Sequence, residues 1–280
     1  IKKKNFYVSI YQNEIPKRSY KYDLCIISAN SSDRLFILNK IKNIKFRTII
    51  LEKLLADNLN NLINLKKIMK KMNVKNIYVN TPRRYMNVFK NIKKKLDLKN
   101  PLSINYTATN FKLGSNSIHI IDLFKYFTDN LPICKIFCDI NKIIKIKNNF
   151  FDFQGFLLMK DKKYNTIFID NVRQNVDIRT GFGGIKILNY PKSFIFNEQF
   201  NELIEITENT KFLKSNIILK KARFNLQSEL TGDYVKKLIN DEILDLPNFD
   251  TSYKSHYVCF KAFENSLNKI NKSLTKYSIT

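Results

Sequence analysis

The first hundred residues alternate between short apolar runs and longer segments with an apolar position every three or four residues. The short runs are typical of strands buried on both faces of a parallel sheet, and the longer segments are typical of helices with one buried face. Strands are expected over 23–29, 46–51 and 74–79, and helices beginning near 31, near 57 and over 83–96. This alternation predicts a right-handed, doubly wound parallel sheet.

The first two of these helices have a defined cap and inner face. Ser31, Ser32 and Asp33 can cap the first helix, and Asp57 opens the second. The inner positions are expected to be Leu35, Phe36, Leu38 and Ile41 in the first helix, and Leu59, Leu62, Leu65, Met69 and Met72 in the second. The two methionines keep the helical spacing, so they are expected in the core.

The pattern changes near Pro101. Helices are expected over 117–127, 231–240 and 251–270. Short strands separated by turn residues are expected over 133–138, 153–159, 166–170, 176–179, 184–188, 203–206 and 217–221. We therefore predict an α/β protein: an incomplete doubly wound, Rossmann-type parallel sheet in residues 1–100, followed by an α+β domain with a large, mostly antiparallel sheet in residues 101–280.

The position of the glycines sets a limit on cofactor binding. A dinucleotide-binding unit needs a G-x-G-x-x-G turn after its first strand, because glycine lets the backbone reach the pyrophosphate. The six glycines of this chain all lie at residue 114 or later, and the run 181–184 has the spacing of a hairpin turn. We expect the first βα unit, on the order of forty residues, to precede Ile1, and the 280 residues alone to bind a dinucleotide weakly.

The net charge of +25 favours nucleic-acid binding at first sight. The excess is almost all lysine, however, and it accompanies asparagine and isoleucine along the whole chain, as an AT-rich coding sequence produces. Arginine, which forks onto phosphates and reads guanine edges, is sparse. We expect solvated helix faces and no specific nucleic-acid partner, and a basic nucleic-acid-binding protein remains an alternative.

The remaining composition excludes several classes of protein. No apolar run approaches the roughly 18 residues of a membrane span, and no signal peptide is recognisable, so a cytoplasmic location is expected. Cys25, Cys134, Cys138 and Cys259 fit no zinc or redox spacing and are expected to be buried free thiols. No metal site is predicted.

Three motifs carry a family resemblance. The segment 23–34 reads D-L-C-I-I-S-A-N-S-S-D-R, and the segment 47–57 reads R-T-I-I-L-E-K-L-L-A-D. The next strand ends in Y-V-N-T-P-R-R-Y over 78–85, and a histidine lies in G-S-N-S-I-H-I-I-D-L over 114–123. Together these resemble the Gfo/Idh/MocA oxidoreductases, in which a strand ends in Glu-Lys-Pro and the next in an Arg-Arg-aromatic motif.

The chain departs from that family pattern at two positions. Leu54 occupies the proline position after Glu52 and Lys53, and Ser115 stands where the family often has an aspartate, four residues before the histidine. Asn116 is the polar residue expected to substitute for that aspartate.

The resemblance implies a hydride transfer between NAD or NADP and a sugar or sugar-nucleotide hydroxyl, in the setting of surface polysaccharide synthesis. His119 is the implied proton acceptor, since imidazole titrates near neutral pH. Lys53 would polarise the reacting oxygen. The implied cofactor contacts are Ser28, Ala29, Asn30, Glu52, Lys53 and Asn80, and the implied substrate contacts are Arg84, Asn116 and His119.

Other interpretations remain open from the sequence. His119 as a packed helix residue and Arg84 as a surface charge at a helix start are the structural alternatives. The whole chain could also be a truncated remnant without turnover. Oligomers through the open face of the second sheet are expected by resemblance alone.

Overall fold

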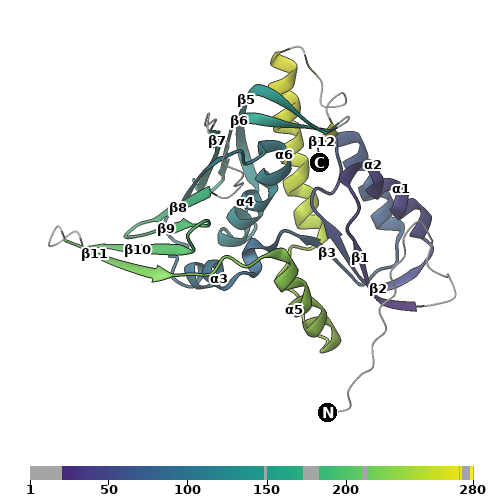
Figure 1. The fold of residues 1–280 in the computed structure, drawn as a ribbon, viewed down its shortest axis with the longest axis horizontal. Coiled ribbons are helices and arrows are strands. Elements are labelled where there is room, and N and C mark those ends of the chain that lie inside the picture. Colours follow the sequence, from purple (N-terminus) through teal and green to yellow (C-terminus); the bar gives the residue numbers. More distant parts are fainter. Residues whose placement is uncertain are drawn as a thin grey trace.

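The computed structural model describes residues 21–147, 150–172, 183–209, 214–270, 272 and 278–279, which form two β-sheets with helices between and beside them (Figure 1). The strands are β1 (Lys21–Ile27), β2 (Lys45–Glu52), β3 (Asn76–Asn80), β4 (Ser103–Thr109), β5 (Ile133–Lys147), β6 (Phe150–Asp161), β7 (Thr166–Val172), β8 (Gly183–Asn189), β9 (Lys192–Asn197), β10 (Glu202–Asn209), β11 (Lys214–Lys221) and β12 (Ser278–Ile279). The helices are α1 (Ser31–Ile41), α2 (Leu59–Lys71), the 3₁₀ turn η1 (Pro82–Tyr85), α3 (Asn87–Lys93), α4 (Leu113–Phe127), α5 (Gln227–Ile239) and α6 (Phe249–Lys269).

The first sheet is parallel, with strand order β1-β2-β3, as predicted. Its central strand β2 is buried, because Ile49 and Leu51 expose no surface. The prediction of a strand buried on both faces was wrong for β1, where Ile26 is 44% exposed. Within the described residues β1 pairs with β2 alone, so it has one covered edge.

The helices of the first sheet confirm one predicted inner face and correct the other. All five predicted inner positions of α2 are buried. In α1 the inner face consists of Ser31, Arg34, Leu38 and Ile41. Phe36 is 61% exposed, with the Lys40 ammonium 4.1 Å from its ring centre. Asn30 and Asn58, rather than the predicted residues, occupy the two N-cap positions.

The helix predicted over 83–96 is broken in two. Met86 is extended between η1 and α3. Arg83 and Arg84 are both buried in η1, and each meets a carboxylate from a different element, Glu198 after β9 and Asp122 on α4. A continuous helix with outward-facing arginines cannot satisfy both ion pairs, so the burial of these two side chains overrides the helical pattern.

Within the described residues the second sheet has nine strands and is mostly antiparallel, as predicted. Its parallel pairs are β4 with β7 and β6 with β12. Three of its strands, β4, β9 and β12, were not predicted, although Ile104, Tyr106 and Ala108 of β4 show the alternation of a strand with one buried face. The strand expected over 176–179 lies outside the described residues.

Of the predicted hairpin turn over 181–184, Gly183 and Gly184 belong to β8, and residues 181 and 182 lie outside the described residues. A Cβ at Gly183 would lie 2.6 Å from Ala108 Cβ and from Thr107 O. Glycine is therefore needed there because β8 approaches β4 closely.

The helix predicted over 117–127 begins earlier, at Leu113. The buried carboxylate of Asp152 accepts hydrogen bonds from the backbone N–H groups of Gly114 (2.6 Å) and Ser115 (3.2 Å) in its first turn. A side chain from a distant strand thus supplies the cap, and no local sequence signal could show it.

Helix α6 packs against α2, α4, β3 and β5, between the two sheets (Figure 1). The His256 ring is buried there, accepting from Leu55 N–H at Nε2 (3.2 Å) and donating from Nδ1 to Ser252 O (2.8 Å). Because C-terminal elements contact both sheets, the boundary at residue 100 stays a prediction.

His256 gives the fold a predicted pH dependence. Burial lowers its pKa from 6.5 to about 3. The unfolded chain therefore takes up this proton below pH 6.5 while the folded chain does not. The free energy of unfolding should decrease as pH is lowered from 6.5 toward 3, by about 1.4 kcal/mol per pH unit for this group. We expect His256→Gln to be less stable than wild type at pH 7.5 and to lose less of its remaining stability between pH 6.5 and 4. Urea denaturation at several pH values measures both, and parallel pH curves for the two proteins would contradict it.

The cysteines are free, but their burial varies more than expected. Cys138 and Cys259 are buried, Cys25 is half-buried and Cys134 is exposed. Burial raises the pKa of the Cys138 thiol to about 12. Among the described residues, no helix is long and apolar enough to cross a membrane, and no cluster of three metal-ligating side chains occurs.

Candidate active site

The carboxyl ends of β2 and β3 lie side by side and carry two of the predicted residues. Glu52 and Asn80 are register partners at the end of these strands. Asn80 Nδ2 donates to Glu52 Oε1 at 2.6 Å, and Gln227 Nε2 of α5 donates to the same oxygen at 2.6 Å. The carboxylate is therefore fixed in direction at the edge where ligands bind in parallel sheets.

Lys53 reaches from the end of β2 to helix α4. Its Nζ donates to Asn116 Oδ1 (2.8 Å) and to Ser115 O (3.1 Å), so the predicted pair Lys53 and Asn116 is in direct contact. Burial lowers the pKa of Lys53 to about 8, against the opposing attraction of Asp152 and Glu52. An amine with this pKa can take up or release a proton close to neutral pH. The Lys53–Leu54 peptide bond is cis.

His119 lies one turn after Ser115 on α4, on the side of the helix that faces Lys53. Its ring is half-buried, and its Nδ1 atom is buried without a hydrogen-bond partner among the described residues. Burial, and then the positive charges of Lys53 and Arg83, hold the pKa of His119 well below its usual value. The imidazole is therefore neutral at physiological pH and able to accept a proton.

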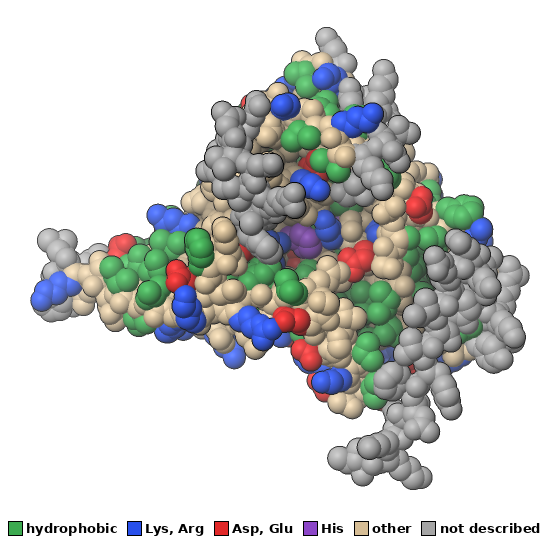
Figure 2. All heavy atoms as spheres, in the orientation of Figure 1, with side chains coloured by type: hydrophobic (Ala, Val, Ile, Leu, Met, Phe, Trp, Pro, Cys, Tyr) green, Lys and Arg blue, Asp and Glu red, His purple; other side chains and the backbone are tan. Residues whose placement is uncertain are grey.

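The site opens to the surface. Figure 2 shows a histidine side chain in a hollow, with Lys or Arg and Asp or Glu side chains around it. His256, the other histidine of the chain, exposes no surface. We refer to Lys53 and His119, with Glu52, Asn80 and Asn116 beside them, as the candidate site.

Ser28, Ala29 and Asn30 follow β1 at the same edge of the sheet. Ser28 and Asn30 are exposed and Ala29 is half-buried, while Ala29 O accepts from the buried Arg34 side chain at 2.7 Å. Their position agrees with a cofactor contact, which stays a prediction.

Arg84 has a different environment from the one its predicted substrate role requires. Its Nε donates to Asp122 Oδ2 (2.7 Å) and its Nη2 to Asp122 Oδ1 (2.5 Å), with both side chains buried. The fork of the guanidinium is thus already occupied by a carboxylate on α4. The substrate role stays a prediction, and the geometry favours a structural one.

A buried group beside the site, Arg83 with Glu198 and Tyr106, was not identified from the sequence. Arg83 Nε donates to Glu198 Oε1 (2.9 Å), and the Tyr106 hydroxyl donates to Glu198 Oε2 (3.0 Å). These residues lie after β3, after β9 and in β4, so only the tertiary fold brings them together. The Arg-Arg motif was the available signal, but it did not distinguish Arg83 from Arg84.

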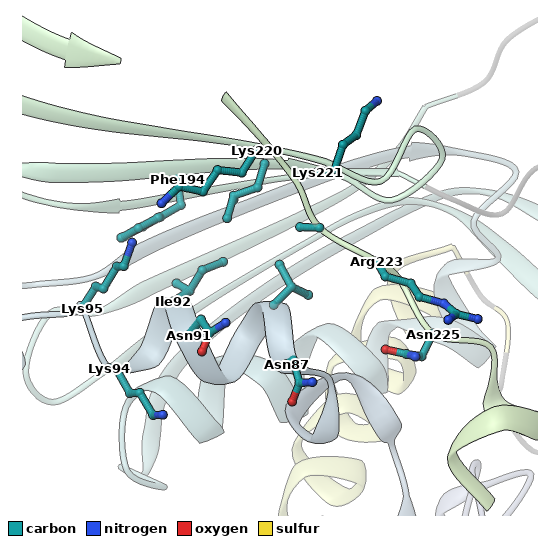
Figure 3. Close-up of a pocket in the computed structure, with 13 residues that line it drawn as sticks. Asn87, Asn91, Ile92, Lys94, Lys95, Phe194, Lys220, Lys221, Arg223 and Asn225 are labelled. Atoms are coloured by element: carbon teal, nitrogen blue, oxygen red, sulfur yellow. The ribbon is translucent and has the colours of Figure 1, made fainter. Parts of the chain in front are cut away.

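A separate groove of about 610 Å³ lies between α3 and the strands β9 to β11 (Figure 3). Its lysines include Lys95 and Lys220, which both bind the carboxylate of Glu205. Neither Lys53 nor His119 lines it. We therefore place the candidate chemistry at the ends of β2 and β3 and not in this groove.

No protein-family model and no curated protein sequence matches the chain. Similar solved structures are Gfo/Idh/MocA-type proteins. Levoglucosan dehydrogenase, in complex with NADH and levoglucosan, is 14% identical, with 88% of this chain and 79% of that chain covered and a TM-score of 0.66.

UDP-N-acetylglucosamine 3-dehydrogenase from Acidithiobacillus ferrooxidans is 9% identical, with 86% and 77% covered and a TM-score of 0.63. A super-repressor mutant of Gal80p from Saccharomyces cerevisiae is 11% identical, with 88% and 79% covered and a TM-score of 0.63. At these identities the likeness confirms the predicted fold and leaves activity to be argued from the site.

Proposed function

We propose that this protein is an oxidoreductase that transfers a hydride between NAD or NADP and a hydroxyl-bearing carbon of a sugar or sugar nucleotide. The observation that carries the proposal is the pairing of a half-buried lysine of lowered pKa with a neutral histidine at the carboxyl edge of a parallel sheet. Strongly perturbed titratable groups gathered at such an edge are typical of catalytic sites.

The side chains of the site divide the proton chemistry between them. When a hydroxyl is oxidised, its carbon loses a hydride and its oxygen loses a proton. His119 is the acceptor for that proton, and the Lys53 ammonium stabilises the negative charge that develops on the oxygen. In the opposite direction His119 returns the proton to the carbonyl oxygen.

The nicotinamide cofactor supplies the hydride acceptor or donor when bound. The exposed Ser28 and Asn30, with Ala29 between them, and the fixed carboxylate of Glu52 beside Asn80 fit the nicotinamide-ribose end of such a molecule. No G-x-G-x-x-G occurs in the 280 residues, so no residue is assigned here to the pyrophosphate.

A sugar nucleotide is the finer proposal for the substrate, with surface polysaccharide synthesis as its setting. It is supported by the fold shared with a UDP-N-acetylglucosamine 3-dehydrogenase. A cytoplasmic location and an oligomer formed through the open face of the second sheet belong to the same proposal.

A protein of the same fold without turnover is the second candidate, and the likeness to a repressor is the observation that favours it. The two candidates are separated by assaying the protein with NAD or NADP against levoglucosan, UDP-N-acetylglucosamine and other UDP-sugars, following the absorbance of the reduced nicotinamide. Turnover that disappears in His119→Ala supports the enzyme. Binding of a sugar or cofactor without turnover in any combination supports the second candidate.

A further inference from the structure

Arg83 is a buried cation that contacts both a carboxylate and two aromatic rings. Its guanidinium makes an ion pair with Glu198, with Nη2 2.8 Å from Oε1, and neither side chain exposes more than 7% of its surface. The guanidinium also lies over the rings of Tyr106 and Phe224, with Cζ 5.8 and 5.5 Å from their centroids. We call Arg83, Glu198 and Tyr106 the Arg83 clamp.

The clamp joins the two sheets at the candidate site. Arg83 lies three residues after Asn80, the register partner of Glu52 at the end of β2, and the turn η1 packs on α4. Glu198 follows β9 in the second sheet, where it also accepts from Gly183 N–H at 3.2 Å. A positive charge is thus fixed next to the end of β2 by a carboxylate of the other sheet.

We infer that Arg83 is a positioning residue of this site: clamped by Glu198 and Tyr106, it fixes a positive charge after β3, next to the strand end that carries Lys53, and this charge keeps His119 in its proton-accepting form. The inference rests on the proposed function for its consequence in turnover. Arg83 touches neither residue through a hydrogen bond among the described contacts, so its action is electrostatic.

Charged groups of both signs lie around Lys53, so the loss of one charge changes the electrostatic field there. Lys53 faces the carboxylates of Asp152 and Glu52 and the cations Arg83 and Lys112. His119 faces Lys53 and Arg83, with the neutral His256 as the other titratable group. The negative charge of Glu198 partly cancels the positive field of Arg83. Removing Arg83 therefore makes the field at Lys53 less positive, and neutralising Glu198 makes it more positive.

Because the two substitutions change the field in opposite directions, they should move the pKa of Lys53 in opposite directions. Competitive labelling with acetic anhydride, followed by mass spectrometry of the Lys53 peptide over a range of pH, reports the pKa of Lys53 because only the neutral amine reacts. In Arg83→Met we expect this pKa to rise by roughly one unit, and in Glu198→Gln to fall by a similar amount. Arg223→Met, which removes an exposed arginine from the strand-to-helix segment next to Phe224, is the matched control and should leave it unchanged.

A purely packing role for the clamp predicts a different result. Loosening it by either substitution would admit water and move the pKa of Lys53 upward in both variants, and that outcome, or no movement in either, overturns the inference. If Arg83→Met fails to fold, Glu198→Gln decides alone by the sign of its shift, and Arg83→Lys, which keeps the charge, should keep the wild-type value. The labelling needs no cofactor, substrate or turnover, so an inactive protein would overturn the proposed function and leave this result standing.

Discussion

Replacing Lys53 by methionine is expected to lower kcat/KM for the proposed sugar oxidation by roughly 10²–10⁴-fold. The substitution keeps the apolar stem and removes the ammonium that stabilises the developing charge on the substrate oxygen. It also leaves Asn116 Oδ1 and Ser115 O, 2.8 and 3.1 Å away in the wild type, without their donor.

The pH dependence of the rate distinguishes loss of the Lys53 ammonium from general damage to the site. The Lys53 ammonium is lost as pH rises through its lowered pKa of about 8. The wild-type rate should therefore decline above pH 8, and in Lys53→Met this decline should disappear together with most of the rate. Steady-state kinetics over pH 6 to 10 measure both.

Two further variants test whether the effect is specific to the lysine side chain at position 53. Lys53→Arg retains a cation whose shape and permanent charge differ, so it should restore little of the rate. Lys67→Met, at an exposed position of α2, is the control and should behave as wild type. A Lys53→Met enzyme with an unchanged kcat/KM would remove Lys53 from the mechanism.

The sequence predicts the residues of the candidate site that lie at strand ends, but not their hydrogen-bond and ion-pair partners. Glu52, Lys53 and Asn80 could be predicted from the family resemblance of their motifs, supported by the rule that the ends of neighbouring parallel strands meet at one edge of the sheet. The partners Asp152, Glu198 and Gln227 could not, since each reaches the site from an element far along the chain.

Some helices and strands could likewise be predicted from the sequence, and others could not. The apolar stripe of α2 predicts its buried face because every member keeps helical spacing, whereas Phe36 of α1 has an apolar side chain and stays exposed. Strand β4 follows Pro101 and alternates apolar and polar residues, so its pattern is present in the sequence although it was not predicted. The two arginines of η1 read as helix surface, and only the buried carboxylates opposite them explain why the backbone breaks at Met86.

Substituting methionine for Arg84 is expected to destabilise the fold by about 3–5 kcal/mol, because it leaves the Asp122 carboxylate buried without its partner. Burial already raises the pKa of Asp122, and Arg84 opposes that shift. Without Arg84 the folded-state pKa rises further above the unfolded value. The loss of stability should therefore be smallest in acid and grow as pH rises toward the new folded-state pKa.

Urea denaturation of Arg84→Met, of the double variant Arg84→Met/Asp122→Leu and of Arg47→Met tests this expectation. The double variant should recover much of the loss, since two apolar side chains can replace a buried ion pair at little cost. Arg47→Met breaks a partly exposed ion pair with Asp241 and should cost much less stability than Arg84→Met.

The same variants test the substrate role that the sequence implied for Arg84. A stable Arg84→Met protein with a raised KM would assign the guanidinium to the substrate and contradict the structural role. A destabilised Arg84→Met protein, rescued by removing Asp122, would instead show that Arg84 holds η1 against α4 through its ion pair with Asp122.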